Sequence, residues 1–189
     1  MGLKGKAKSR IQELRKEVEK GYKESAEKYP RLHRLMPFVA KLFIAGLVFR
    51  AIIFLNPDTY FLQEYLAEIT IDILNLLGGN YSLRDALILG ERGSYLVTRD
   101  CLGWKSVSAF IGLIFASTKN LLDHSRTLVA GTVLLLAANL IRVVSTIWLS
   151  EAGIISFEII HTFLWRWGMT FLVLLAWYIW LKTRSNPEI

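Results

Sequence analysis

The sequence contains a single cysteine, Cys101, so an intrachain disulfide bond is excluded. It also lacks a glycine-rich phosphate loop and the Gly-x-Ser-x-Gly motif of serine hydrolases. No small-residue cleavage site follows the first apolar run, which begins near Met36. We therefore expect that run to remain as an anchor and not to act as a cleaved signal peptide.

Charged residues are absent from four stretches, residues 42–49, 107–118, 127–141 and 167–181. The charges gather elsewhere, and residues 1–35 hold eleven Lys and Arg against five Glu. This segregation is typical of a membrane protein with several spans and a basic cytoplasmic arm. The net charge of +7 therefore indicates anionic lipid headgroups as neighbours, and we expect no nucleic-acid partner.

The apolar stretches predict an all-α integral membrane fold with a bundle of about four transmembrane helices. The expected spans are residues 35–55, 104–122, 127–149 and 160–181. The second has only 14 residues up to Ser117, short of the roughly 20 that cross a bilayer. It reaches residue 122 only if Lys119 extends its ammonium group to the membrane surface.

The remaining segments predict elements at the two membrane faces. Residues 61–77 combine an apolar face with three acidic residues, which favours an amphipathic or re-entrant helix at the outer surface. Residues 81–101 contain two strand-like runs around Gly90–Gly93 and predict a short extracytoplasmic β-hairpin that ends at Cys101. Residues 8–29 predict an amphipathic helix, for which a solvated tail is the alternative. The resulting domains are a basic cytoplasmic arm (1–34), a transmembrane core (35–182) and a cytoplasmic tail (183–189).

Lys and Arg in the short loops set the expected orientation. Basic residues lie in the arm, in the 118–126 loop (Lys119 and Arg126) and in the tail (Lys182). The charged residues of the 150–159 loop are all acidic. Four spans with both termini in the cytoplasm satisfy all of these loops. A fifth span at residues 61–77 would place the basic 118–126 loop outside and the acidic 150–159 loop inside, which contradicts the rule twice.

This topology brings three reactive side chains to one membrane depth. Cys101 precedes the outer end of the second span, and His161 opens the fourth. Arg142 lies 15 residues into the third span, about 22 Å above its inner end at about 1.5 Å per residue. A thiol, a cation and an imidazole at the outer interface can form a nucleophilic site, in which the cation stabilises a thiolate or an oxyanion.

Each of the three residues also has a plainer interpretation. A lone cysteine is usually an inert small apolar residue, although Asp100, Gly103 and Lys105 give this one a polar setting. Arg142 could extend to the outer headgroups, but Asn139 lies three residues earlier on the same helical face and favours a wall that faces the bundle. A histidine at the start of a span is common.

The motifs resemble those of the exosortase/archaeosortase family. Cys101-Leu102-Gly103 at the head of one span, Asn139-Leu140-Ile141-Arg142-Val143 in the next and His161 in the last follow the family order Cys-x-Gly, Asn-x-x-Arg and His. The resemblance covers about residues 60–181. It implies a membrane cysteine transpeptidase that cleaves C-terminal sorting signals of secreted proteins through a thioacyl intermediate and transfers them to a lipid or another surface acceptor.

By this resemblance, Cys101 is the nucleophile, Arg142 stabilises the thiolate or oxyanion, and His161 is the general acid and base. Trp104, Asn139 and Trp165 are candidate substrate-binding residues. The implied partners are secreted proteins whose signal consists of a motif, an apolar helix and a basic tail. The expected location is the cell membrane, with the active site at the extracytoplasmic face.

Other functions remain open at this point. The same three residues would serve an intramembrane-type cysteine protease in which water resolves the thioester. A non-enzymatic scaffold or small transporter would use Arg142 as a structural charge. We expect no cofactor and no metal, because one cysteine and one outer histidine do not fill a zinc shell, even though Asp100, Glu151 or Glu158 could join them.

Overall fold

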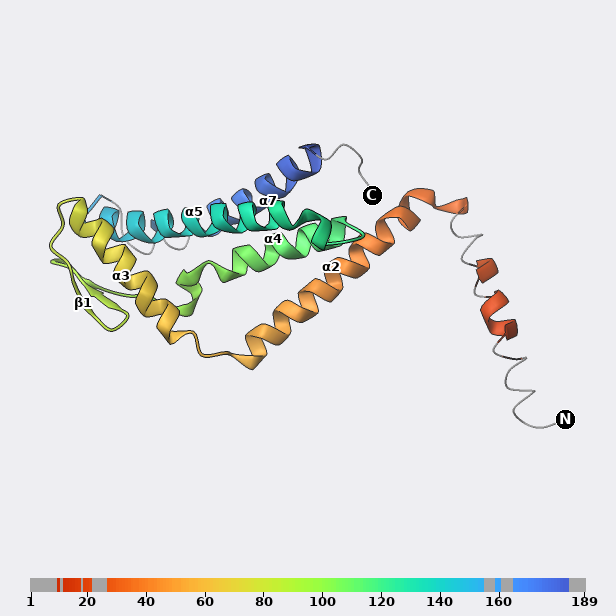
Figure 1. The fold of residues 1–189 in the computed structure, drawn as a ribbon, viewed down its shortest axis with the longest axis horizontal. Helices are drawn as coiled ribbons and strands as arrows, with labels where there is room; N and C mark the ends of the chain where they lie inside the picture. Colours follow the sequence, from red (N-terminus) through yellow and green to blue (C-terminus); the bar gives the residue numbers. More distant parts are fainter. Residues whose placement is uncertain are drawn as a thin grey trace.

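The computed structural model describes residues 10, 12–17, 19–21, 27–154, 159–160 and 165–183. Over these residues the chain is mostly helical, with one small β-sheet at one end of the helices (Figure 1). The residues described between positions 10 and 21 are helical, as predicted for that part of the arm, and the other residues of the helix expected over 8–29, apart from 27–29, lie outside the described residues.

The first expected span is an uninterrupted helix, α2 (Pro30–Leu55). Pro30 occupies its first turn, where the missing N–H of proline costs no hydrogen bond, and Asn56 ends it in a left-handed conformation with φ 40°. The 21 residues Leu35–Leu55 are long and apolar enough to cross a membrane. These bounds agree with the predicted span.

The expectation that the second span reaches residue 122 is wrong. The helix α4 (Trp104–Ser117) ends after 14 residues, because Thr118 is extended with φ −123° and ψ 157°. Asn120 Nδ2 then donates a hydrogen bond to Asp123 Oδ1 (2.9 Å), which supports the turn before η2 (Leu122–His124). At about 1.5 Å per residue, α4 is about 21 Å long.

The third and fourth expected spans correspond to α5 (Ser125–Glu151) and α7 (Trp165–Thr183). With η2, α5 forms the second segment that is long and apolar enough to cross a membrane, Leu122–Glu151. The apolar part of α7, Trp167–Thr183, is a shorter apolar helix. Residues 161–164 of the expected fourth span lie outside the described residues.

The helix α2 runs in the opposite direction to α4, whereas α7 runs in the same direction as α4. Lys41 of α2 donates a hydrogen bond to the Thr118 carbonyl at the end of α4, while Arg99, just before α4, reaches the last turn of α2. These two helices are therefore antiparallel. Trp177 Nε1 of α7 donates to Ser117 Oγ (3.0 Å), and α5 and α7 both pack against α4.

The predicted two-stranded hairpin is instead a three-stranded antiparallel sheet. Its strands are β1 (Ser82–Arg84), β2 (Leu87–Leu89) and β3 (Ser94–Leu96), in the order β1-β2-β3. Asp85 adopts a positive φ of 57° and turns the chain, which splits the first expected strand in two. The last strand also ends at Leu96, so Cys101 does not lie at the end of a strand as predicted.

The helix α3 (Tyr60–Leu76) connects the sheet to the helical bundle. Its buried residues are Ala67, Thr70, Ile71 and Leu74, and it packs against α5 and the segment that holds Cys101. Glu68 and Asp72 are exposed. The amphipathic character predicted for residues 61–77 is therefore present, and the buried face joins α3 to one apolar core with the sheet and α5.

Candidate functional site

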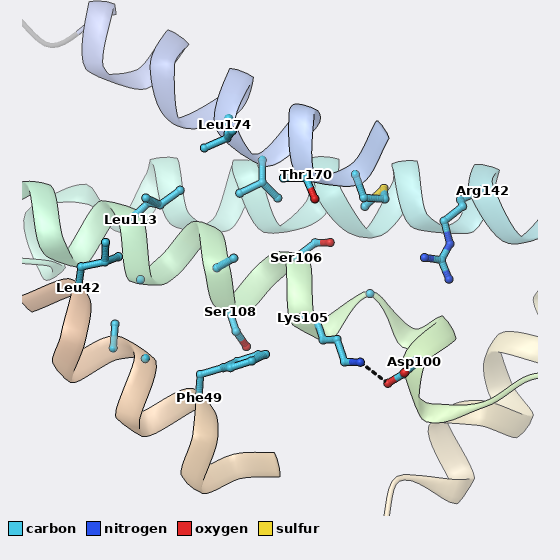
Figure 2. Close-up of a pocket in the computed structure, with 17 residues that line it drawn as sticks. Leu42, Phe49, Asp100, Lys105, Ser106, Ser108, Leu113, Arg142, Thr170 and Leu174 are labelled. Carbon is cyan, nitrogen blue, oxygen red and sulfur yellow. Dashed lines mark ion pairs between the residues drawn. The ribbon is translucent and has the colours of Figure 1, made fainter. Parts of the chain in front are cut away.

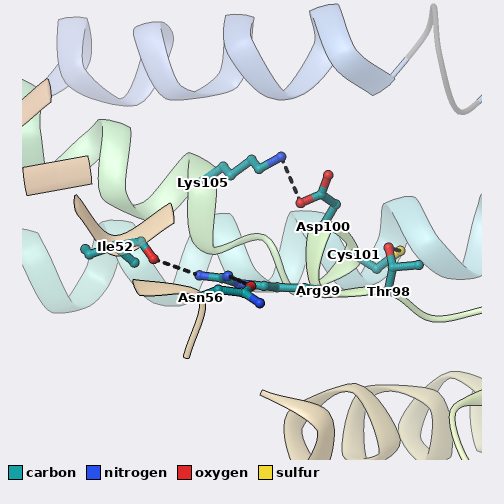
Figure 3. Close-up of polar contacts among 7 residues, drawn as sticks. All are labelled: Ile52, Asn56, Thr98, Arg99, Asp100, Cys101 and Lys105. Carbon is teal, nitrogen blue, oxygen red and sulfur yellow. Dashed lines mark hydrogen bonds and ion pairs between the residues drawn. The ribbon is translucent and has the colours of Figure 1, made fainter. Parts of the chain in front are cut away.

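Cys101 lies on a short 3₁₀ helix, η1 (Arg99–Leu102), between the sheet and α4. Its backbone N–H donates to the Thr98 carbonyl (2.9 Å), and its Sγ lies 3.6 Å from Thr98 Oγ1. The cysteine is half-buried, with η1 placed directly before α4 (Figure 3). This position leaves the thiol accessible to a reacting group while its backbone is fixed.

Asn139 of α5 holds the backbone of the cysteine segment in place. Its side-chain Nδ2 donates to the Cys101 carbonyl oxygen (2.6 Å), and the residue is 2% exposed. A buried amide that binds a main-chain carbonyl is a positioning group. Asn139, predicted to bind substrate, therefore contacts the cysteine backbone in this structure, and its buried Oδ1 has no hydrogen-bond partner among the described residues.

The backbone conformation at position 103 explains why a glycine stands two residues after the cysteine. It has φ +73°, which side-chain-bearing residues rarely adopt, and it caps α4. A Cβ at this position would lie 2.8 Å from Asn139 Cγ. The glycine thus permits both the sharp turn into α4 and the close approach of α5.

Arg142 follows Asn139 by one helical turn and lines the same small cavity as Cys101. This cavity, of about 30 Å³, is enclosed by β3 and α5, and Tyr95, Val143 and Thr146 also line it. Arg142 is half-buried, and its guanidinium has no hydrogen bond or ion pair within the part of the chain that the structure describes. The structure therefore brings two of the three predicted catalytic side chains to one cavity.

The sheet that covers this cavity is tied to the end of α5. The Tyr95 hydroxyl donates to Glu151 Oε1 (2.9 Å) and accepts from the Ser150 hydroxyl (Oγ at 3.2 Å), and Glu151 Oε2 accepts from the Arg92 backbone N–H (3.0 Å). Burial raises the pKa of Tyr95 most, the Ser150 hydrogen bond lowers it in part, and Glu151 raises it further. Tyr95 therefore stays neutral at ordinary pH and donates its proton to Glu151, which ties β3 to the end of α5.

The sequence reasoning missed Arg99, which fixes η1 against α2. Its Nη1 donates to Asn56 Oδ1 (2.7 Å) and its Nη2 to the Ile52 carbonyl (3.4 Å) (Figure 3). The guanidinium also lies 4.8 Å from the ring centroid of Trp104, which stacks on Phe49 at 5.2 Å. Trp104, predicted to bind substrate, is therefore engaged in packing. The sequence feature that could have indicated this role is an arginine two residues before the cysteine.

His161 lies outside the described residues, so the third predicted catalytic group has no assigned position. Trp165 begins α7, and its side chain is likewise outside the described part. Among the residues that the structure does describe, no group of three or more His, Cys, Asp or Glu side chains could hold a metal ion.

The fold and the cavity define a mostly helical membrane protein in which a cysteine and an arginine line one small cavity at the end of the bundle. The family model for transmembrane exosortases matches residues 29–181, which is most of the chain and includes all three motifs. The chain therefore belongs to the transmembrane exosortase family, with a membrane location and an exosortase-type function. No match was found among curated proteins or among solved structures.

The role of Gly103 gives a testable prediction. Gly103→Ala should displace η1 from Asn139 and cut substrate processing at least about tenfold, because a misplacement of 1 Å near a reacting group can cost more than that. Gly78 is a matched control: it also has a positive φ, of 90°, but nothing lies within 4 Å of its Cβ position. Gly78→Ala should lose only about 1 kcal/mol of stability and keep its activity. Equal activities in the two variants would contradict this role.

Proposed function

We propose that this protein is a membrane cysteine transpeptidase that cleaves C-terminal sorting signals from secreted proteins and transfers them to a lipid or another surface acceptor. The observation that carries the proposal is the cavity shared by Cys101 and Arg142, one turn from the buried amide that holds the cysteine backbone. A thiol beside a guanidinium is suited to attack on a carbonyl, because the cation stabilises both the thiolate and the developing oxyanion.

In the proposed reaction, the thiolate of Cys101 attacks the scissile carbonyl and forms a tetrahedral oxyanion that Arg142 stabilises. His161 accepts the thiol proton and returns it to the leaving amine as the C–N bond breaks. A thioacyl enzyme remains. An amine or hydroxyl of the acceptor then attacks the thioester, loses its proton to His161 and releases Cys101 as the C–S bond breaks.

The proposed orientation places both termini in the cytoplasm and the site at the extracytoplasmic face. It rests on the basic arm and on the Lys and Arg of the loops before α5 and after α7. The antiparallel arrangement of α2 and α4 is compatible with it, since Lys41 in the first half of α2 donates to the Thr118 carbonyl at the end of α4. A substrate that carries an apolar helix and a basic tail would then lie in the same membrane with its scissile bond at the outer interface.

The experiment that tests this proposal is covalent capture of a substrate. Purified full-length protein is incubated with synthetic peptides that carry a candidate motif, apolar helix and basic tail, and the intact mass is measured. The expected result is an acyl adduct that maps to Cys101 and is released by hydroxylamine. His161→Ala should form it at least about a hundredfold more slowly, because general base catalysis contributes that much.

Two results would contradict the proposal. An adduct on another residue would show that Cys101 is not the nucleophile. A processed protein that ends in a free carboxylate when lipid acceptors are supplied would indicate proteolysis by water and not transfer.

A further inference from the structure

A groove of about 570 Å³ lies between α2, α4 and α7 and ends at Arg142 (Figure 2). Its walls include the small residues Ala45, Gly46 and Ala109, which keep it open. A Cβ at Gly46 would meet nothing within 4 Å. Arg142 lines both this groove and the Cys101 cavity, so the two spaces share one residue.

The lining of the groove changes in character along its length. Leu42, Leu113 and Leu174 line one end, and the other end holds Arg142 and the pair Asp100 and Lys105 (Figure 2). The hydroxyl groups of Ser106 and Thr170 lie between the two ends, as the close-up shows. A site that is apolar at one end and charged at the other fits an amphiphile whose tail and headgroup lie in that order.

The charged end favours an anionic group. Lys105 Nζ and Asp100 Oδ1 form an ion pair (2.8 Å), so these two charges offset each other. Arg142 is left as a cation with no ion pair among the described residues. A guanidinium in this position binds a phosphate through two parallel hydrogen bonds better than a lysine would.

The size of the groove favours one acyl chain. Its volume of about 570 Å³ lies within the roughly 300–1,000 Å³ of sites that hold one small molecule. A spanning helix of about 20 residues, about 30 Å long and about 10 Å across, occupies about 2,400 Å³. Such a helix could place only individual side chains in the groove.

We infer that the groove between α2, α4 and α7 binds one acyl chain of a glycerophospholipid whose phosphate pairs with Arg142. This inference rests on the proposed function and names the acceptor that the function requires. With its phosphate at Arg142, the lipid has its headgroup amine or hydroxyl beside the Cys101 cavity, where the thioester forms. The apolar end of the groove then points toward the membrane interior in the proposed orientation.

The test is photolabelling of the purified full-length protein with a phosphatidylethanolamine that carries a diazirine in one acyl chain. Vesicles of phosphatidylcholine supply the background lipid. The expected adducts map to groove residues of α2, α4 and α7. Ala109→Phe should reduce them about tenfold, because loss of space for two methylene groups weakens binding by about that factor. Gly46→Phe should have the same effect from the opposite wall.

Ala51→Phe is the matched control, because Ala51 is an exposed alanine of α2 that does not line the groove. It should label as the native protein does. Unchanged labelling in both groove variants would overturn the inference, and so would labelling of the groove by the signal peptide in place of the lipid. Cys101→Ala should keep its label, since binding needs no thiol. A failure of the transpeptidase proposal would therefore appear as full processing activity of Cys101→Ala, and a failure of this inference as unchanged labelling of the groove variants.

Discussion

Cys101→Ala should abolish processing of the sorting signal, with a loss of at least about a thousandfold in rate. In the proposed reaction the thiolate forms the acyl intermediate, and removal of a nucleophile costs about this much or more in enzymes that use covalent catalysis. The measurement is the ratio of processed to unprocessed substrate in membranes that contain equal amounts of native and variant protein.

The structure makes this a clean substitution. Asn139 binds the backbone carbonyl of Cys101 and not its side chain, so the alanine variant keeps the contact that positions η1. The side chain is half-buried, and its only hydrogen-bonding contact within the described part of the chain is the 3.6 Å approach of Thr98 Oγ1. The thermal midpoint should therefore change by no more than about 4 °C, which corresponds to about 1 kcal/mol for a chain of this size.

Thr98→Val is a useful companion, because it removes the hydroxyl beside the thiol and leaves Cys101 in place. It should retain activity. Full activity of Cys101→Ala would remove the basis of the proposed mechanism. A cysteine that an impermeant thiol reagent fails to reach, in cells and in detergent, would instead favour a scaffold role.

The helices were the most predictable part of this fold. Long stretches without charge have few alternatives in a membrane, and the apolar part of α2, Leu35–Leu55, agrees with the predicted span at residues 35–55. The short elements were less predictable. The turn at Asp85 depends on a single left-handed residue, and the end of α4 depends on the local conformation of Thr118, neither of which hydrophobic patterns report.

The site was predictable only as far as its motifs reach. The spacing of Asn139 and Arg142 places both on one face of a helix, and the structure puts both beside the cysteine segment. The contact between Gly103 and Asn139 joins two motifs that lie far apart in the sequence, and only the packing of α5 against η1 reveals it. The same applies to Arg99, whose partners on α2 lie more than 40 residues earlier.

Arg142→Ala should lower the rate constant for acylation by about a hundredfold to a thousandfold. Loss of one donor to a developing oxyanion has this effect in other acyl-transfer enzymes. The measurement is a single-turnover rate of adduct formation on Cys101 at saturating peptide, which separates chemistry from binding. Arg126→Ala on the same helix is the control, because Arg126 is exposed at the opposite end of α5.

Arg142→Lys separates a chemical role from a structural charge. A lysine extends to the headgroups as well as an arginine does, so it would restore activity if Arg142 only stabilised the bundle end. If the guanidinium has to bind an oxyanion or a phosphate through two hydrogen bonds, the lysine variant should recover the thermal midpoint and remain at least about tenfold slow. Complete recovery of the acylation rate by lysine would assign Arg142 to membrane anchoring, and the cavity it shares with Cys101 would then lose its place in the mechanism.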